Sequence, residues 1–137
     1  MIIRWGTEAD EPVLQAVDRL ISEEKLLAAL SQKRILMAVE GETLLGWLRF
    51  GWFWDSVPFM NLLFILAPYR HRGIGATLVW YWEEHMRAQG YRQVLTSTRA
   101  DEEAQHFYRH LNYRDAGVLL LKDEPAELLL LKELTEI

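Results

Sequence analysis

The chain has 137 residues, a length that fits one domain with its own hydrophobic core. Hydrophobic residues make up 50% of it, charged residues 26%, and cysteine is absent, which favours a globular, water-soluble protein and excludes disulfides, thiolate metal sites and a cysteine nucleophile. The net charge of −5 is the reverse of a nucleic-acid-binding surface, and the longest apolar stretch, 57–68, is too short to span a bilayer. Neither nucleic acid nor a membrane is therefore an expected partner.

The first half of the chain predicts one strand, two helices and three further strands. After a short apolar run, cap residues and Pro12 introduce apolar positions at three- and four-residue spacing, which predicts a helix as far as Ile21. Ser22 is the expected N-cap of a second helix. The expected ranges are 1–5 for the first strand, 12–21 and 22–30 for the helices, and 35–39, 43–54 and 59–67 for the strands that follow.

The second half predicts a long helix, a strand, a short helix and two closing strands. The expected ranges are 74–89 and 101–111 for the helices, and 93–98, 118–121 and 128–134 for the strands, with Gly90 as the stop of the long helix. No repeat, low-complexity tract or change of composition interrupts the chain, so residues 1–137 are expected to form a single domain. This order of elements indicates an α/β fold around a mixed sheet.

The most informative segment lies between the strand that ends near Pro68 and the helix that begins near Ile74. It reads Arg70-His71-Arg72-Gly73-Ile74-Gly75-Ala76. Glycines let the backbone approach a ligand closely, the first amides of a helix lack internal acceptors, and arginines donate charge-assisted hydrogen bonds to phosphate. The segment is therefore a candidate anion cradle, with an ordinary strand-to-helix turn as the alternative. It is neither a P-loop, since no Gly-Lys-Ser/Thr follows, nor a dinucleotide fingerprint, since Leu78 stands at the third glycine position.

The pattern Arg70-x-x-Gly73-x-Gly75-Ala76 resembles the acetyl-CoA pyrophosphate loop of the GNAT superfamily of N-acetyltransferases. It stands after the fourth expected strand and before a long helix, as it does in that family. Farther along, the family commonly has an Asn, then an Ala, a Tyr and a Gly-Phe pair at fixed offsets. The residues at those offsets here are Asp101, Ala104, Tyr108 and Asn112-Tyr113.

The resemblance implies a GNAT-like α/β fold with a mixed sheet, helices on both faces, and fourth and fifth strands that splay apart. It implies acetyl-CoA as the acyl-donor substrate, with its diphosphate on the glycine loop. Its pantetheine arm would pair with the main chain of Ile65 or Leu66, one of whose amides would face the thioester oxygen. Asp101 stands at the family's Asn, which contacts CoA. Because an Asp side chain cannot donate a hydrogen bond, a helix N-cap is the favoured interpretation. The candidate cofactor-binding residues are Ile65, Leu66, Arg70, His71, Arg72, Gly73, Ile74, Gly75, Ala76 and Asp101.

Tyr108 is the candidate catalytic residue, as general acid, because it stands at the family's Tyr offset. A phenol with an ordinary pKa of about 10 is protonated at neutral pH and can donate its proton to a departing thiolate. Helical periodicity alone gives Tyr108 a structural role instead, on an apolar face with Ala104, Phe107 and Leu111.

The other titratable side chains provide no clear general base and no metal site. Glu40, Glu42 and Asp55 lie at expected strand ends, where solvated turn residues are common, so no general base is evident. A water chain could remove the proton, and an amine with a low pKa needs no strong base. His106 and His110 lie one helical turn apart without a third ligand, so no metal site is expected.

Aromatic residues crowd the expected strand 43–54. Alternation places Phe50, Trp52 and Trp54 on one face and Trp47 and Phe53 on the other. Two interpretations are open: a strand buried on both faces, or an aromatic wall that attracts a cationic amine. Residues 80–82 are Trp-Tyr-Trp, which indicates burial on more than one side of the long helix and leaves a homodimer contact open.

Together these inferences predict an N-acetyltransferase that transfers the acetyl group of acetyl-CoA to a primary amine of a small molecule or peptide. Without cysteine, the amine would attack directly within a ternary complex. The alternative is a non-catalytic module that binds or senses acyl-CoA. No N-terminal segment has the form of a secretory signal, so the expected location is the cytoplasm.

Overall fold

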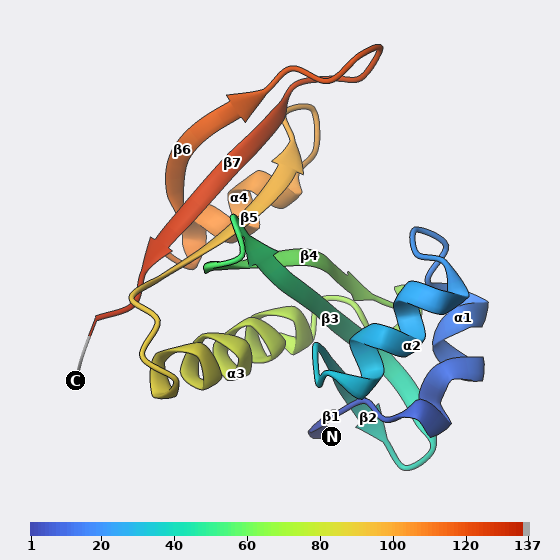
Figure 1. The fold of residues 1–137 in the computed structure, drawn as a ribbon. Coiled ribbons are helices and arrows are strands. Elements are labelled where there is room, and N and C mark those ends of the chain that lie inside the picture. The colour runs from blue at the N-terminus through green and yellow to red at the C-terminus, as the bar shows by residue number, and fades with distance from the viewer. Residues whose placement is uncertain (136–137) are drawn as a thin grey trace. The chain divides into compact units, whose positions relative to one another are not determined.

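The computed structural model describes residues 1–135, which form strands and helices interspersed along the chain (Figure 1). The first half contains β1 (Ile2–Trp5), η1 (Glu8–Asp10), α1 (Glu11–Val17), α2 (Glu23–Ser31), β2 (Ile35–Glu40), β3 (Thr43–Phe53) and β4 (Val57–Ile65). The second half contains η2 (Ala67–Tyr69), α3 (Ile74–Ala88), β5 (Gln93–Arg99), α4 (Ala104–His110), β6 (Arg114–Leu119) and β7 (Glu127–Glu133). The order of strands and longer helices is the one predicted from the sequence.

The strands form one mixed sheet in the order β1-β2-β3-β4-β5-β7-β6. Strands β4 and β5 run parallel and pair at two positions, Phe59 with Leu95 and Met60 with Thr96. The neighbouring pairs β1–β2, β2–β3, β5–β7 and β6–β7 are antiparallel. The chain divides into two compact units, unit 1 with Met1–Phe50 and Leu62–Trp82, and unit 2 with Gly51–Asn61 and the described residues from Glu83 onward.

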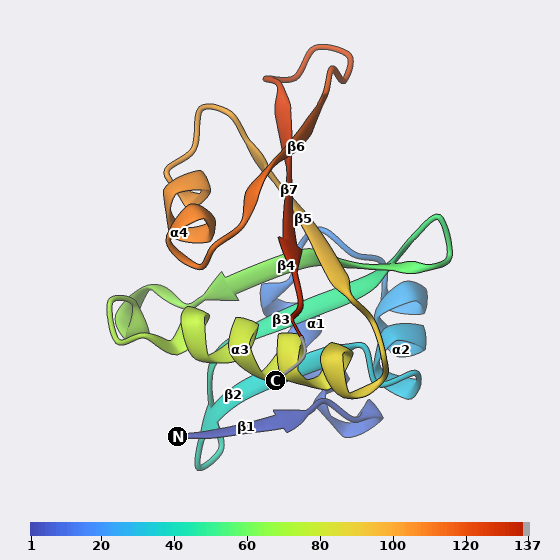
Figure 2. The ribbon, with the colours of Figure 1, turned by 90° about the vertical axis from the view of Figure 1, so that its left-hand side faces the viewer.

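Unit 1 packs helices against both faces of its strands (Figure 2). On one face, α1 and α2 cover β2 and β3 through a buried cluster of Leu14, Leu26, Ala29, Leu30, Ile35, Met37, Val39, Leu44 and Trp47. On the other face, the ring of Phe50 lies 5.8 Å from the ring of Trp82 in α3. Trp47 and Phe50 are each 1% exposed and, being three residues apart in a strand, face opposite ways. This part of β3 is therefore buried on both faces.

Helix α1 ends at Val17, four residues before the predicted end, because Asp18 turns into the interior. Asp18 leaves the helix with an extended backbone and is 2% exposed. Its carboxylate accepts hydrogen bonds from Arg49 Nε at 3.0 Å and from Trp47 Nε1 at 3.2 Å. A buried charge needs such partners, so this ion pair fixes the chain after α1. As a result Leu20, an apolar residue within the predicted helix 12–21, is 79% exposed.

Unit 2 is organised by β5, which pairs with β7 along its whole length, and by a second buried ion pair. Glu83 of α3 is 4% exposed and accepts hydrogen bonds from Tyr113 Oη at 2.8 Å and from Lys132 Nζ at 2.9 Å. Because breaking a buried pair leaves an uncompensated charge, these contacts tie the second half of α3 to β7 and to the segment after α4.

Strand β6 differs most from its prediction. It spans Arg114–Leu119 instead of 118–121, because β7 pairs with the chain almost as soon as it leaves the turn after α4. That turn contains Asn112 in the left-handed conformation, with φ of 73°. The apolar residues that suggested the strand run past its end into the hairpin loop.

The exposed aromatic residues correct two further predictions. Trp54 lies outside β3, in the turn before β4, with a left-handed φ of 56° and 80% exposure. Along α3, Trp82 is fully buried, while Trp80 and Tyr81 are 56% and 44% exposed. The long helix is therefore buried on one side, and the prediction of burial on more than one side was wrong.

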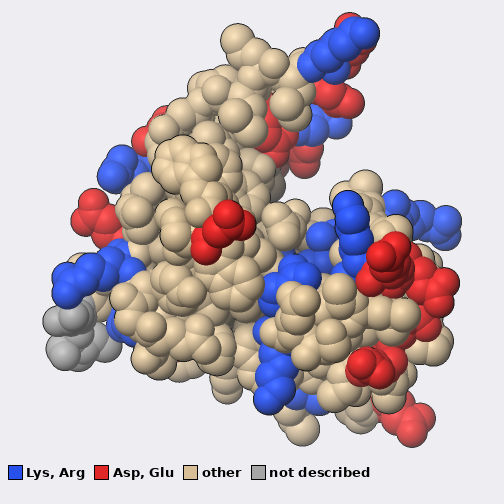
Figure 3. Space-filling view, in the orientation of Figure 1, with Lys and Arg blue, Asp and Glu red and all other residues tan. Residues whose placement is uncertain are grey.

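None of the helices within residues 1–135 has the length and apolarity needed to cross a bilayer. Basic and acidic side chains lie interspersed on the side of the molecule that carries α1 and α2 (Figure 3).

Candidate functional site

The glycine loop of unit 1 begins where β4 ends at Ile65 and continues through η2 into α3. Two of its residues have left-handed backbones, His71 with φ of 65° and Gly73 with φ of 77°. A Cβ on Gly73 would meet no atom within 4 Å, so backbone conformation, and not lack of space, requires glycine there. Left-handed residues in a turn can direct neighbouring amides toward one concave side, which is an anion-binding arrangement.

The amides of this loop are unpaired. The first amide of α3 that donates to the backbone is that of Thr77, which reaches Gly73 O at 3.0 Å. No amide of residues 71–76 has a hydrogen-bond acceptor among the residues that the structure describes. Three of these six residues, 71–73, are exposed, and the positive end of the α3 dipole lies at the same place. The loop therefore presents a run of main-chain donors that can hold an oxyanion.

Arg70 and Arg72 are fixed against the chain before them. Arg70 Nε donates to Ile65 O at 2.9 Å, and its guanidinium lies 5.3 Å from the centre of the Phe64 ring. The guanidinium of Arg72 lies 5.6 Å from the centre of the Tyr69 ring. Arg70 thus closes the start of the loop through Nε, and its two terminal nitrogens make no hydrogen bond to any described residue. Both arginines add positive charge beside the unpaired amides.

The two candidate main-chain contacts at the end of β4 are not equivalent. Leu66 N donates to Leu45 O of β3 at 2.9 Å, so this amide is already used within unit 1. Successive amides of a strand point to opposite edges, so the amide of Ile65 points away from β3. Gly46 of β3 allows the close approach here, because a Cβ on it would lie 2.8 Å from Phe64 O. Of the two, Ile65 carries the amide that remains for a ligand.

Tyr108 lies on α4 in unit 2 and is 6% exposed. Its ring meets Phe107 and Tyr113 edge-on, with ring centres 5.1 and 5.6 Å away, and its hydroxyl lies 4.0 Å from Met60 Sδ. Burial raises the pKa of Tyr108 to about 12, against a smaller opposite effect of the Thr96 hydroxyl. The phenol is thus a protonated donor at any physiological pH, and the structural packing predicted for Tyr108 is present as well.

The hydroxyl of Tyr108 is directed at the end of the parallel β4–β5 ladder. Met60 and Thr96 form the second of the two residue pairs in that ladder, and Thr96 Oγ1 donates to Met60 O at 3.0 Å. The structure therefore brings Tyr108, Met60 and Thr96 together within unit 2.

Asp101 does not cap α4. The helix begins three residues later, at Ala104, with Glu103 as its N-cap residue. The carboxylate of Asp101 instead accepts two hydrogen bonds from Arg99, at 2.9 and 3.1 Å, on the exposed surface. The capping interpretation was wrong, because the exposed Arg99 offers a charged bidentate partner close by in the chain.

The carboxylates considered as bases are solvent-exposed. Glu40, Glu42 and Asp55 all lie exposed in or beside turns. Two buried carboxylates, Asp18 and Glu83, were not predicted from the sequence, and both are held in ion pairs. The sequence did contain an indication of their burial, since each of these two acidic residues stands among apolar residues at helical spacing.

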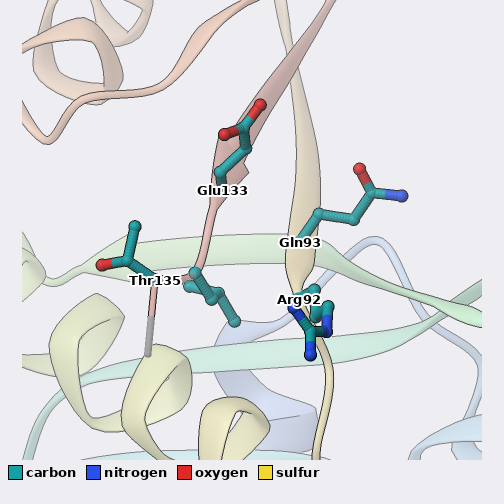
Figure 4. A pocket seen from close by; sticks show the side chains of 5 residues that line it. Arg92, Gln93, Glu133 and Thr135 are labelled. Carbon is teal, nitrogen blue, oxygen red and sulfur yellow. The ribbon is translucent and has the colours of Figure 1, made fainter. Parts of the chain in front are cut away.

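Two surface depressions of unit 2 lie apart from the predicted site residues. One, of about 430 Å³, is lined by Arg92, Gln93, Glu133, Leu134 and Thr135 (Figure 4). The other, of about 670 Å³, is lined by Arg87, Asn112, Arg114, Leu131, Lys132, Glu133 and Thr135. The first has one basic and one acidic residue in its lining, whereas the second has three basic residues and one acidic residue.

Comparison with known proteins adds family evidence. The sequence model of the acetyltransferase (GNAT) family matches residues 4–113 of the chain. No curated protein sequence matches it.

Solved structures show the same fold. The chain is similar to Ard1 from Thermoplasma volcanium, with a TM-score of 0.85, 16% identity and 98% of each chain covered. It is similar to the ribosomal-protein-alanine N-acetyltransferase from Brucella melitensis, with a TM-score of 0.81, 20% identity and coverage of 98% of this chain and 100% of that one. It is also similar to an aminoglycoside 6'-N-acetyltransferase complexed with coenzyme A, with a TM-score of 0.84, 17% identity and coverage of 100% and 99%. The predicted mixed-sheet α/β fold is confirmed.

Proposed function

The chain belongs to the acetyltransferase (GNAT) family, and from that premise we propose that it transfers the acetyl group of acetyl-CoA to a primary amine of a small molecule or peptide. The observation that carries the proposal is the run of unpaired amides at residues 71–76, beside Arg70 and Arg72. A diphosphate is the part of coenzyme A whose oxygens such a run can satisfy. Acyl transfer is the chemistry of the family.

In the proposed complex, the loop binds the diphosphate through main-chain donors, with His71, Arg72, Gly73, Ile74, Gly75 and Ala76 as the contributing residues. The terminal nitrogens of Arg70 add a charged contact, while its Nε keeps the loop closed through Ile65 O. Leu66 lines the start of the loop, and Asp101 stays a proposed cofactor contact from the exposed surface of unit 2.

For the chemical step we assign the oxyanion contact to the amide of Ile65, since that of Leu66 is used by Leu45. A preorganised backbone donor at a developing oxyanion stabilises the transition state by roughly 2.7–4 kcal/mol. The amine nitrogen forms a bond to the thioester carbonyl carbon, and the carbon–sulfur bond breaks. The Tyr108 hydroxyl gives its proton to the leaving thiolate, and the proton released by the nitrogen restores the phenol through solvent.

No described carboxylate of suitable environment is assigned as general base. The two buried ones are paired and the turn residues are exposed. We therefore propose that the amine loses its proton to water, which favours acceptors whose amine is partly neutral at working pH.

The acceptor class is supported by two observations. Ribosomal-protein-alanine and aminoglycoside N-acetyltransferases, both acting on amines by name, share this fold. The net charge of −5 favours encounter with cationic amines over anionic ones.

The cytoplasmic location and the single domain over residues 1–137 stay predictions.

The test combines binding and turnover. Release of free thiol from acetyl-CoA is measured with a panel of amines and peptides, and thermal unfolding is measured with coenzyme A. At 100 times its dissociation constant, a ligand adds about 2.7 kcal/mol to the free energy of unfolding. Stabilisation together with amine-dependent thiol release is the expected result. No stabilisation by millimolar coenzyme A would contradict the proposal.

A second function, a non-catalytic module that binds acyl-CoA, is favoured by one observation: no described carboxylate is suited to act as a base. It predicts stabilisation by coenzyme A without thiol release for any amine. Turnover with even one amine excludes it.

A further inference from the structure

The hairpin of β3 and β4 in unit 2 carries three aromatic side chains that stay accessible to solvent. Trp54 is 80% exposed, and Phe53 and Phe59 are partly exposed. The ring centre of Phe53 lies 4.6 Å from that of Trp54 and 5.9 Å from that of Phe59, on which it is stacked. These three rings, called the aromatic surface below, form one continuous patch from the tip of the hairpin into β4.

The charge beside the aromatic surface is negative and uncompensated. Asp55 follows Trp54 in the turn, is exposed, and is the only charged residue in 51–61. Among the described residues, no basic side chain pairs with Asp55 or lies over the three rings. Aromatic faces and a carboxylate both attract cations. The composition of the hairpin tip therefore favours a ligand of positive charge.

The backbone of the turn holds Trp54 in an unfavourable conformation. Trp54 and Asp55 both have left-handed conformations, with φ of 56° and 60°, and Ser56 N donates to Phe53 O at 3.1 Å. Glycine and asparagine are the residues that favour the two central positions of such a hairpin turn. Core packing does not offset the strain, because the Trp54 side chain is exposed. What tryptophan adds at this position is an accessible ring.

The aromatic surface lies on the face of β4 opposite to Tyr108. Phe59 and Met60 are successive residues of the strand, so their side chains point to opposite faces. Met60 Sδ lies 4.0 Å from the Tyr108 hydroxyl, and the pairing of β4 with β5 ends at Met60. Asn61, which is exposed and shares the face of Phe59, is the next residue of β4. The proton donor and the aromatic surface thus lie on two sides of the end of the β4–β5 ladder.

We propose that the aromatic surface and Asp55 bind a second cationic group of the acceptor, which makes the substrate class an amine with a further ammonium group on a flexible chain. This inference rests on the proposed acetyl transfer and adds which amines are accepted. The bound ammonium group keeps its proton among the rings, and the amine at the other end of the chain attacks the thioester. A positive charge elsewhere in the acceptor lowers the pKa of the attacking amine, which suits a site without an assigned general base.

The first experiment measures binding without acetyl-CoA, so it does not depend on turnover. Choline is the cationic probe, and dimethylbutanol, which has the same shape without the charge, is the neutral control. Choline is expected to shift the indole N–H resonance of Trp54 in ¹⁵N–¹H NMR spectra and to leave that of Trp80, an exposed tryptophan of unit 1, in place. A Trp54 resonance that choline does not move, or that both probes move equally, overturns the inference.

Two variants test the residues of the site. Trp54→Gly removes the outermost ring and relieves the left-handed strain, so it is expected to raise the dissociation constant of choline about two- to fivefold without lowering the unfolding temperature. Asp55→Asn keeps a residue that tolerates the turn and is expected to weaken binding at low salt more than at high salt. An affinity that neither variant changes places the cation elsewhere and overturns the inference.

Asp123→Asn is the matched control for the loss of charge. Asp123 is also an exposed residue of unit 2 with a left-handed backbone, with φ of 58°, but it lies in the β6–β7 turn. It is expected to leave the affinity for choline unchanged. Equal losses of affinity in Asp55→Asn and Asp123→Asn would show an effect of net charge alone and would overturn the part assigned to Asp55.

The last experiment measures thiol release from acetyl-CoA with diaminobutane and longer linear diamines, each beside the monoamine of the same chain length. The diamines are expected to have KM values about tenfold lower, and Trp54→Gly is expected to reduce this difference while kcat is kept. Equal KM values for diamines and monoamines overturn the inference and leave the proposed acetyl transfer standing. Choline binding at Trp54 with no thiol release from any amine overturns the proposed function instead, and with it the part of these rings in acceptor binding.

Discussion

The glycine loop and the surroundings of Tyr108 differ in their exposure to solvent and in the kind of group that they offer to a ligand. The loop in unit 1 is exposed, with unpaired amides at 71–76 and two left-handed residues, His71 and Gly73. Tyr108 in unit 2 is 6% exposed and packed between two aromatic rings. The loop offers main-chain groups, which no side-chain truncation removes. Tyr108 offers one hydroxyl, which a single substitution removes entirely.

Because of this difference, variants of the two regions can distinguish an effect on ligand affinity from an effect on the reaction rate. Changes in the loop act on ligand affinity through backbone conformation. Changes at the Tyr108 hydroxyl act on the rate, because the ring alone maintains the packing. Variants of the two regions should therefore move different measured quantities.

The largest effect is expected for Tyr108→Phe. Loss of a general acid lowers the rate by roughly 10²–10⁴-fold, while the ring contacts and the affinity for coenzyme A are kept. The measurement is steady-state thiol release, with coenzyme A affinity from thermal shift. A drop in affinity with an unchanged rate would reverse the assignment of roles.

Tyr113→Phe is the matched control for this variant. It removes the hydrogen bond to the buried Glu83 and should lower the free energy of unfolding by about 1–3 kcal/mol. Because Tyr113 has no assigned part in proton transfer, the rate measured well below the unfolding temperature should stay close to that of the natural chain.

A smaller effect is expected for Gly73→Ala. The residue has φ of 77°, and a left-handed backbone costs an L-residue about 1–2 kcal/mol. The loop then loses its conformation, and the dissociation constant of coenzyme A rises about tenfold. Isothermal titration calorimetry measures it.

Gly41→Ala controls for the strain itself. Gly41 has φ of 60° and, like Gly73, open space around the position of a Cβ, but it lies in the β2–β3 turn. It should lower stability by a similar amount and leave coenzyme A affinity unchanged. If both variants weaken binding alike, the effect of Gly73 is not specific to the loop.

The smallest effect concerns alkaline pH. Burial raises the pKa of Tyr108 to about 12, whereas an unfolded tyrosine ionises near about 10. The Tyr108 phenol therefore stays protonated to a higher pH in the folded state than in the unfolded state. Its contribution to the free energy of unfolding is complete below pH 10 and is lost as the pH rises toward 12. Near pH 11 this loss is about 1 kcal/mol.

The predicted fall in the free energy of unfolding with rising pH is checked by urea unfolding at pH 9 and pH 11. The natural chain should lose more stability than Tyr108→Phe between the two values, with the titration of Tyr113 common to both. An equal loss would place the Tyr108 hydroxyl in a solvated environment in the folded protein.

The loop could be predicted from the sequence because its chemistry is local. A strand end, a glycine in the left-handed conformation and a helix start follow one another within a few residues, and their unpaired amides result from helix geometry. The Ser22 cap of α2 followed from the same kind of local rule, and Ser22 Oγ accepts a hydrogen bond from Lys25 N at 3.3 Å.

Features that depend on distant partners could not be predicted. The end of α1 is set by Arg49, thirty-one residues after Asp18, and the burial of Glu83 by Lys132. The extent of β6 depends on the register of β7. Asp101 lost its predicted capping role to Arg99, since a nearby charged partner competes with helix amides.

The most direct test of the account follows the amides of residues 71–76 by two-dimensional ¹⁵N–¹H NMR during titration with coenzyme A. Pantetheine, which lacks the diphosphate, is the matched ligand. With coenzyme A these six amide resonances should shift most in the spectrum, and with pantetheine they should stay in place. Saturable binding of coenzyme A that leaves all six unmoved would contradict the account.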